Sequence, residues 1–90
     1  MTTTAIAAVT LRQRNTVRGE IIWVASYQQP LVRTDALLGD GTGTLLLRFV
    51  GRASVPGLIA GCRVVAEGSP GLVRGALVMV NPIYSFVTGE

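Results

Sequence analysis

Arginine is the residue type of this sequence best suited to binding a ligand. The chain has eight basic residues among its 90 residues, and all of them are arginines. A guanidinium group can pair with a phosphate through two parallel hydrogen bonds, and it can also stack on a nucleobase. Trp23 and Tyr27 add aromatic rings on which a base could stack. These residue types favour a polyanionic ligand.

The sequence lacks the residues of a typical enzyme or metal centre. It has one cysteine, Cys62, and no histidine, which excludes an internal disulfide, a histidine general base and a Cys/His metal site. Asp40 and Glu67 are explained by a turn and by an outward strand position, and no serine has a histidine to activate it. We therefore expect a protein that is not an enzyme and needs no cofactor. We expect Cys62 to be a buried, inert thiol.

Composition limits the class of protein. The formal net charge is +3 and the isoelectric point is about 10.0, a balance that favours polyanionic partners. Hydrophobic residues make up 49% of the chain and charged residues 14%, which argues against disorder and predicts an apolar surface patch and self-association. The start resembles no signal peptide, and Gly75 and Pro82 interrupt the longest apolar stretch. We expect a soluble, cytoplasmic protein of bacterial type that does not bind membranes or a small-molecule substrate.

The clearest structural signal is a β-hairpin between Arg33 and Val50. Residues 40 to 43 form its turn, and they open no helix, so their glycines do not indicate a phosphate-binding loop. Pairing Gly39 with Thr44 would set Asp35 across from Arg48 and Leu37 across from Leu46 on the outward face. The alternating residues of the opposite face should then form the core: Thr34, Ala36, Leu38, Leu45, Leu47 and Phe49.

The rest of the chain is predicted to cover the inner face of this hairpin. Residues 1 to 8 are expected to form a flexible leader and residues 9 to 87 a single domain. A long strand should span 17 to 27, with Gly19 marking a bulge or a sharp bend. Further strands should span 62 to 73, with a kink or bulge at 68 to 71, and 76 to 80, where Asn81 and Pro82 end the strand. Pro56 and Gly57 permit only a short helical cap after the hairpin, with Val55, Leu58 and Ile59 on the core. This order predicts an all-β, five-stranded Greek-key OB-fold barrel with a short helical cap between strands three and four.

Several motifs resemble those of one group of OB-fold domains. They are Gly19 in the first strand, LGDGTGTLLLRF over 38 to 49, Gly61 ahead of VVAEG, and LVRGALVMVNPIY over 72 to 84. Together they resemble the OB-fold of the RecG helicase wedge domain and the related anticodon-binding-type OB modules, and also small stand-alone OB proteins of actinobacteria. The likeness covers residues 16 to 86. It implies a module that binds single-stranded nucleic acid, with DNA favoured over RNA.

In an OB-fold, single strands commonly lie on the outward face of strands two and three and on the loops beside it. In this chain Arg33 and Arg48 would lie on that face, Arg74 on a flanking loop, and Arg52 just beyond the hairpin. The predicted nucleic-acid-binding residues are therefore Arg33, Arg48, Arg74, Arg52, Trp23 and Tyr27.

Some residues of this face also have a simpler interpretation. Arg48 could pair with Asp35 across the strands, an exposed contact that contributes about 0.2 to 1 kcal/mol. Trp23 could fill the core, which we favour slightly over a stacking role. Leu37 and Leu46 would form an apolar patch of the kind that marks protein interfaces. The alternative function is therefore an oligomerising or adaptor module whose hairpin face binds protein.

The segment from Val9 to Val17 also alternates, which predicts an extended edge with arginines at 12, 14 and 18 on one side. Such a row of charges could bind phosphate, or it could protect the edge from aggregation.

Overall fold

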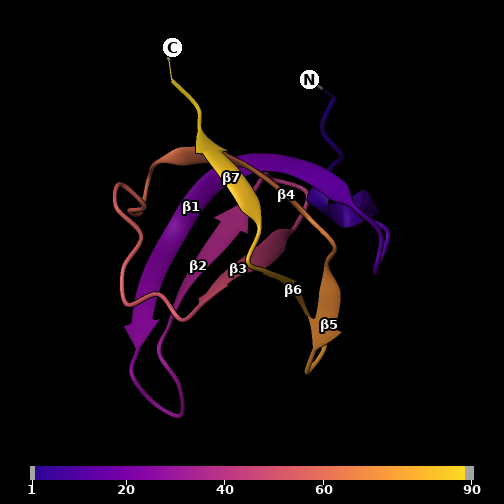
Figure 1. The fold of residues 1–90 in the computed structure, drawn as a ribbon. Coiled ribbons are helices and arrows are strands. Elements are labelled where there is room, and N and C mark those ends of the chain that lie inside the picture. The colour runs from indigo at the N-terminus through magenta and orange to yellow at the C-terminus, as the bar shows by residue number, and fades with distance from the viewer. Residues whose placement is uncertain (1, 89–90) are drawn as a thin grey trace.

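The computed structural model describes residues 2 to 88, which fold into one mixed, strongly curved β-sheet (Figure 1). A short 3₁₀ turn, η1, precedes the strands at Ile6–Ala8. The strands follow the order β5-β6-β3-β2-β1-β4-β7, and every neighbouring pair is antiparallel except β3 and β6, which are parallel. Their bounds are β1 Asn15–Tyr27, β2 Arg33–Gly39, β3 Thr44–Val50, β4 Arg63–Gly68, β5 Gly71–Val73, β6 Ala76–Val80 and β7 Ile83–Phe86. No helix within the described residues has the length and apolar character needed to cross a bilayer.

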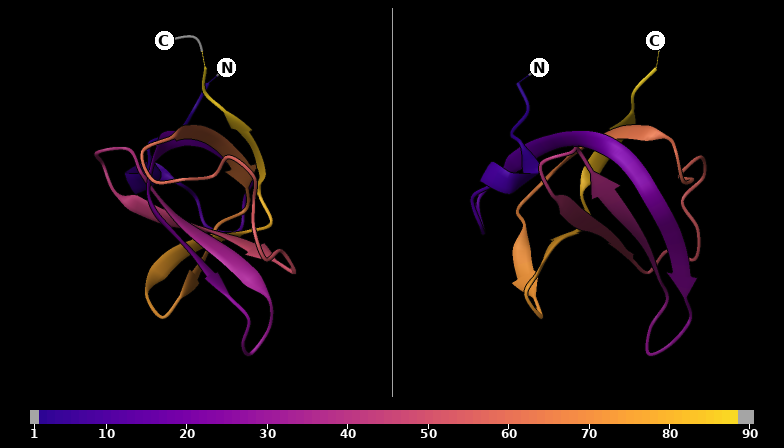
Figure 2. Two further views of the ribbon diagram at one scale, coloured as in Figure 1. Left: turned by 90° about the vertical axis from the view of Figure 1, so that its left-hand side faces the viewer. Right: turned by 180° about the vertical axis from the view of Figure 1, so that it is seen from behind.

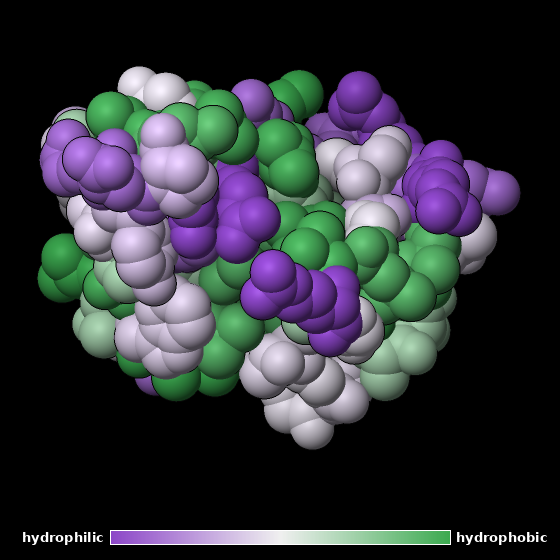
Figure 3. Space-filling view, turned by 90° about the horizontal axis from the view of Figure 1, so that it is seen from below, coloured by the Kyte–Doolittle hydropathy of each residue, from purple (hydrophilic) through white to green (hydrophobic). Residues whose placement is uncertain are grey.

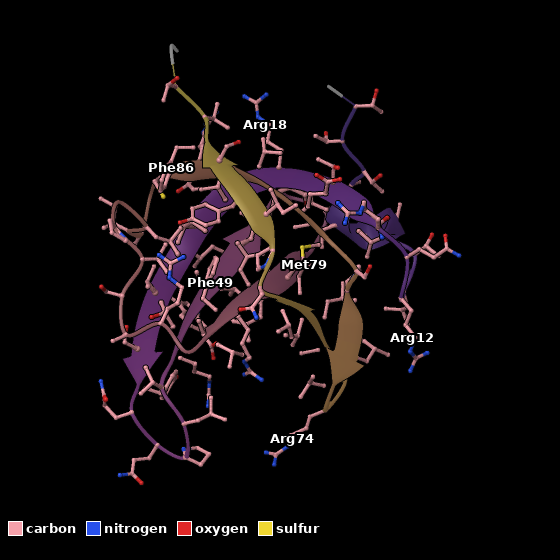
Figure 4. All side chains as sticks on the ribbon, viewed as in Figure 1. Arg12, Arg18, Phe49, Arg74, Met79 and Phe86 are labelled. Carbon is pink, nitrogen blue, oxygen red and sulfur yellow. The ribbon has the colours of Figure 1, made fainter. Side chains whose placement is uncertain are left out.

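The predicted hairpin is confirmed in its register. Gly39 lies opposite Thr44, Asp35 opposite Arg48, and Leu37 opposite Leu46. The inner face is buried as expected, and Figure 4 shows Phe49 and Met79 pointing into the space that the sheet encloses. The side chains that form the core are Ile6, Val17, Ile21, Ala36, Leu38, Leu45, Leu47, Phe49, Val55, Leu58, Val64, Ala66 and Met79.

β1 connects the two parts of the sheet. It pairs with β2 from Glu20 to Tyr27 and with β4 from Asn15 to Glu20, and its ribbon arches over the molecule in Figure 2. The bulge in this strand lies at Ile22, where the pairing with β2 shifts, and not at Gly19. Gly19 has a different role, because a Cβ atom at this position would overlap the carbonyl oxygen of Gly39. The missing side chain therefore allows β1 and β2 to approach closely.

The sheet has seven strands, whereas the sequence predicted five. Ser69 and Pro70 separate β4 from β5, and Asn81 and Pro82 separate β6 from β7. A proline has no N–H group to continue a ladder, so each of these positions interrupts the pairing. The final segment, to which the sequence analysis assigned no strand, is β7 and pairs with β4.

The predicted helical cap was wrong. Residues 51 to 62 form turns, and Gly57 and Gly61 have φ angles of 81° and 95°, which a right-handed helix cannot contain. Val55 and Leu58 are nevertheless buried as expected, whereas Ile59 is 64% exposed.

Residues ahead of β1 contact the sheet. Ile6, which we assigned to the leader, is 1% exposed, and the N–H of Thr4 donates to the carbonyl of Thr16 at 2.7 Å. The predicted extended row of arginines does not form, because Arg12 has a φ of 60° within a turn and β1 begins only at Asn15.

Asp40 joins this N-terminal segment to the turn between β2 and β3. Its Oδ2 accepts a hydrogen bond from the N–H of Ile6 at 2.9 Å, and its Oδ1 accepts from the N–H and the hydroxyl of Thr42 at 2.9 and 2.6 Å. Burial acts to raise the pKa of Asp40. The hydrogen bonds from the Thr42 hydroxyl and from the N–H groups of Ile6, Thr42 and Gly43 outweigh it, and they hold this pKa below its ordinary value of 3.8.

Asp40→Ala is therefore expected to lower the free energy of unfolding by about 1 to 2 kcal/mol at neutral pH. A pKa that is depressed in the folded state contributes stability above the unfolded-state pKa, and this contribution is lost as the pH falls through the folded-state pKa. The difference in the free energy of unfolding between wild type and variant should thus be largest at neutral pH and should shrink below pH 3.8. Urea denaturation at neutral and acidic pH measures it. Glu67→Ala, which removes an exposed ion pair with Arg14, is the control with a smaller expected loss, and a pH-independent difference for Asp40→Ala would contradict the prediction.

Candidate nucleic-acid interface

The outward face of β1, β2, β3 and β6 carries most of the predicted binding residues. Residues directly opposite each other in neighbouring strands share a face of the sheet. The observed registers therefore place three rows of side chains on this face: Trp23, Leu37, Leu46 and Val78; Ala25, Asp35, Arg48 and Val80; and Tyr27, Arg33 and Val50.

Asp35 holds two arginines on this face. Nε and Nη2 of Arg48 donate to Oδ1 and Oδ2 of Asp35 at 3.1 and 3.2 Å, and Nε of Arg33 donates to Oδ2 at 3.2 Å. The Asp35 side chain is 4% exposed, whereas those of Arg33 and Arg48 are 21% and 25% exposed. The predicted pair of Asp35 and Arg48 is thus present, but it is one half of a partly buried cluster. Two cations and one anion leave this cluster with a net charge of +1.

Tyr27 extends the cluster to the end of β1. The Cζ atom of Arg33 lies 4.4 Å from the centre of the Tyr27 ring, which is the geometry of a cation–π contact. Arg33 donates to Asp35 through Nε, and its two terminal nitrogens form no hydrogen bond to residues 2 to 88. These nitrogens are therefore available to a ligand beside the ring of Tyr27, a residue that is 39% exposed.

Trp23 lies on the surface, so the favoured interpretation of this residue as a core side chain was wrong. It is 41% exposed and lies opposite Leu37. Regular alternation from the buried Ile21 would turn Trp23 inward, but the bulge at Ile22 reverses the alternation and directs Val24 to the core instead. Trp23 and Tyr27 consequently share the outward face.

The other two predicted arginines are not hydrogen-bonded to the Asp35 cluster. Arg74 occupies the turn between β5 and β6, where its φ of 52° and that of 81° for Gly75 suit a two-residue hairpin turn, and its side chain extends from the tip of the turn in Figure 4. Arg52 is exposed beyond β3, and its carbonyl accepts a hydrogen bond from the hydroxyl of Thr34 at 2.8 Å. The structure brings together Arg33, Arg48, Trp23 and Tyr27 on one face, whereas Arg52 follows the end of β3 and Arg74 lies in the turn between β5 and β6.

The rest of the outward face is apolar. Leu37 and Leu46 are half-buried opposite each other, and the neighbouring Val80 is 54% exposed. Figure 3 shows extended apolar surface between hydrophilic side chains on the molecule as seen from below. The register thus places Leu37 and Leu46 on the outward face, as predicted, and their role in an interface stays a prediction.

Sequence reasoning did not anticipate an open hollow of about 420 Å³ beside the turn between β2 and β3. Arg18 and Arg63 line it together with Glu20 and Asp40. Two arginines and two carboxylates leave this hollow without net charge. It should therefore attract a phosphate less strongly than the Arg33–Arg48 cluster does. Cys62 packs against the core and is half-buried.

Neither a protein family model nor a curated protein matches the chain. The argument for function consequently depends on the geometry of the outward face.

Proposed function

We propose that this chain is a non-catalytic OB-fold module that binds single-stranded nucleic acid on the outward face of β1, β2 and β3. One observation carries the proposal. Two exposed aromatic residues, Trp23 and Tyr27, share this face with the guanidinium groups of Arg33 and Arg48. Stacking platforms beside cations are the combination by which proteins bind single strands without reading their sequence.

The strand connections support the OB-fold. Two residues separate β4 from β5, and two separate β6 from β7. If each of these pairs is one kinked strand, then β1 neighbours β2 and β4–β5, and β3 neighbours β2 and β6–β7. The two kinked strands also pair with each other. Each of the five resulting strands then has two neighbours, as in a closed Greek-key barrel with the OB order.

Under this proposal, a nucleic-acid strand lies across both aromatic rings. Trp23 and Tyr27 are separated by about 13 Å along β1, at about 3.3 Å per residue, which leaves room for a base on each ring. A phosphate beside the base on Tyr27 would lie near the terminal nitrogens of Arg33. Arg74 and Arg52 would contact phosphates further along the strand. The resemblance to the RecG wedge domain favours DNA as the nucleic acid.

A fluorescence titration with a labelled single-stranded oligonucleotide at two salt concentrations tests the proposal. Wild type should bind at low salt, and its affinity should fall as the salt concentration rises, because bound phosphates release counterions. Arg33→Gln and Arg48→Gln should each lower the slope of log K against log salt by about 0.7 for each phosphate contact removed.

Arg14→Gln provides the matched control, because it removes the same charge from an exposed pair with Glu67 outside the cluster. Its slope should equal that of wild type. Absence of saturable binding by wild type at low salt would refute the proposed function.

A protein-binding role for the same face is the second candidate function. The observation that favours it is the apolar patch of Leu37, Leu46 and Val80, since such patches mark interfaces on small domains. Under this alternative, the hairpin face of one chain is covered by another protein or by another copy of the chain. Sedimentation of Leu46→Arg beside the wild type distinguishes it, because a charge at this position would disrupt that contact.

A further inference from the structure

Asp35 is a buried carboxylate on the face that is proposed to bind an anion. The strand registers place it on the outward face, opposite Ala25 and Arg48, but its side chain is only 4% exposed. A phosphate on this face would meet the field of a negative charge, so the charge of Asp35 by itself opposes binding. The face therefore contains an acidic residue whose charge alone does not explain its place there.

The hydrogen bonds of Asp35 use one part of each guanidinium group and leave the rest available. Arg48 donates to this carboxylate through Nε and Nη2, and Arg33 donates through Nε. Nη1 of Arg48 and both terminal nitrogens of Arg33 form no hydrogen bond to residues 2 to 88. Terminal guanidinium nitrogens are suited to binding phosphate oxygens. Asp35 therefore orients two arginines without occupying the nitrogens that a phosphate would need.

Each of the two arginines is also held at a second point. The guanidinium group of Arg33 lies over the ring of Tyr27, with Cζ 4.4 Å from the ring centre. The backbone around Arg48 is bonded to Asn81, whose N–H donates to the Arg48 carbonyl at 2.7 Å and whose Oδ1 accepts from the N–H of Val50 at 2.9 Å. Both arginines are thus ordered by the protein itself before any ligand is present.

We propose that Asp35 is a positioning residue, which fixes the guanidinium groups of Arg33 and Arg48 for the backbone phosphates of a single strand. This inference rests on the proposed function of the outward face. Asp35 does not contact the ligand and acts through the two arginines. A free surface arginine loses side-chain conformational entropy when it binds, and an arginine that is already ordered avoids most of that cost. The gain from ordering two arginines exceeds the repulsion from one carboxylate, because salt and water screen that repulsion at the surface.

Titration of Asp35→Asn with a labelled single-stranded oligonucleotide at low salt tests the proposal, because charge and positioning predict opposite results. The variant makes the face more positive, so charge alone predicts tighter binding. Positioning predicts binding about tenfold weaker, since two arginines must then be ordered by the ligand. Asp35→Glu keeps the charge but is longer by one methylene group, so it should also bind more weakly. Glu67→Gln is the matched control, because it removes one carboxylate from an exposed pair with Arg14 and should bind as tightly as wild type or slightly more tightly.

A double-mutant cycle separates positioning from a general effect on the fold. In a chain that already carries Arg48→Gln, Asp35→Asn should weaken binding by only about threefold, because one arginine is left to orient. A tenfold loss in both backgrounds would show that Asp35 acts through the fold, and it would overturn the proposal. Circular dichroism verifies that each variant is folded. Binding of Asp35→Asn that equals or exceeds that of wild type would overturn this inference and leave the proposed function intact, whereas absence of binding by wild type would refute both.

Nuclear magnetic resonance of the free wild type tests the same inference without a substitution at Asp35, so it also applies if Asp35→Asn does not fold. The Nε–H groups of Arg33 and Arg48 donate to the buried carboxylate, and their hydrogens should exchange slowly with water. The Nε–H group of Arg14 is the internal reference, since this exposed arginine pairs with Glu67 through Nη1. Exchange at Arg33 and Arg48 as fast as at Arg14 would show that the two arginines are not ordered before binding, and the proposal would then be wrong.

Discussion

Gly19→Ala is expected to destabilise the domain by about 3 kcal/mol, at the upper end of the range for overpacking a well-packed site. The added Cβ atom would overlap the carbonyl oxygen of Gly39 and lie 2.9 Å from its carbonyl carbon. Both atoms belong to the backbone, so neither can rotate away as a side chain could. The loss would be a large part of the free energy of unfolding of a typical folded protein, which is roughly 5 to 15 kcal/mol.

Gly71→Ala is the matched control for this change. Gly71 also lies in a strand, but a Cβ atom there meets nothing within 4 Å. This variant should be unchanged or slightly more stable, because alanine restricts the unfolded chain. Urea denaturation of the two variants beside the wild type measures both effects. Equal denaturation midpoints for Gly19→Ala and Gly71→Ala would show that the close approach of β1 and β2 does not require the absence of a side chain at position 19.

Trp23→Ala is expected to weaken binding of a single-stranded oligonucleotide by about 5- to 150-fold, because stacking on an aromatic ring contributes about 1 to 3 kcal/mol per base. The residue is 41% exposed on the outward face, so its removal should change folding less than binding. Titration of a labelled oligonucleotide with wild type and variant measures the loss. Ile59→Ala, an exposed apolar side chain in the turns after β3, should leave the affinity unchanged.

The same prediction has a direct spectroscopic test. Trp23 is the one tryptophan of the chain, so intrinsic fluorescence reports this position alone. A base stacked on the indole ring should quench the emission of wild type as oligonucleotide is added. Saturable binding without any change in this emission would remove Trp23 from the interface, and it would leave the arginine cluster as the basis of the proposed function.

The hairpin from Arg33 to Val50 could be predicted because its determinants are local. The turn residues and the alternating apolar residues are adjacent in the sequence, and together they specify one register. That register also predicted the pair of Asp35 and Arg48. It did not reveal that Arg33 shares the same carboxylate, because this contact depends on side-chain conformations that no strand pattern determines.

The features that sequence reasoning missed depend on distant segments. The bulge that exposes Trp23 forms in a strand that pairs with β2 along one part and with β4 along another. A period-two pattern contains no sign of this change of partner. The seven-strand count depends on Pro70 and Pro82, since each interrupts a strand whose apolar pattern otherwise continues. The predicted cap was wrong for a local reason, because Gly57 and Gly61 adopt positive φ angles in the segment where the short cap was expected.

The two pairings of β1 also bear on the order in which the domain assembles. β1, β2 and β3 are consecutive strands joined by short turns, whereas the ladder between β1 and β4 joins residues as far apart as Asn15 and Gly68. Ladders between distant segments form more slowly than local ones, because a long loop must close first. The three-strand meander should therefore form first during folding. Its surface already contains Trp23, Tyr27, Arg33 and Arg48, so the residues proposed to recognise a ligand would be in place before the sheet is complete.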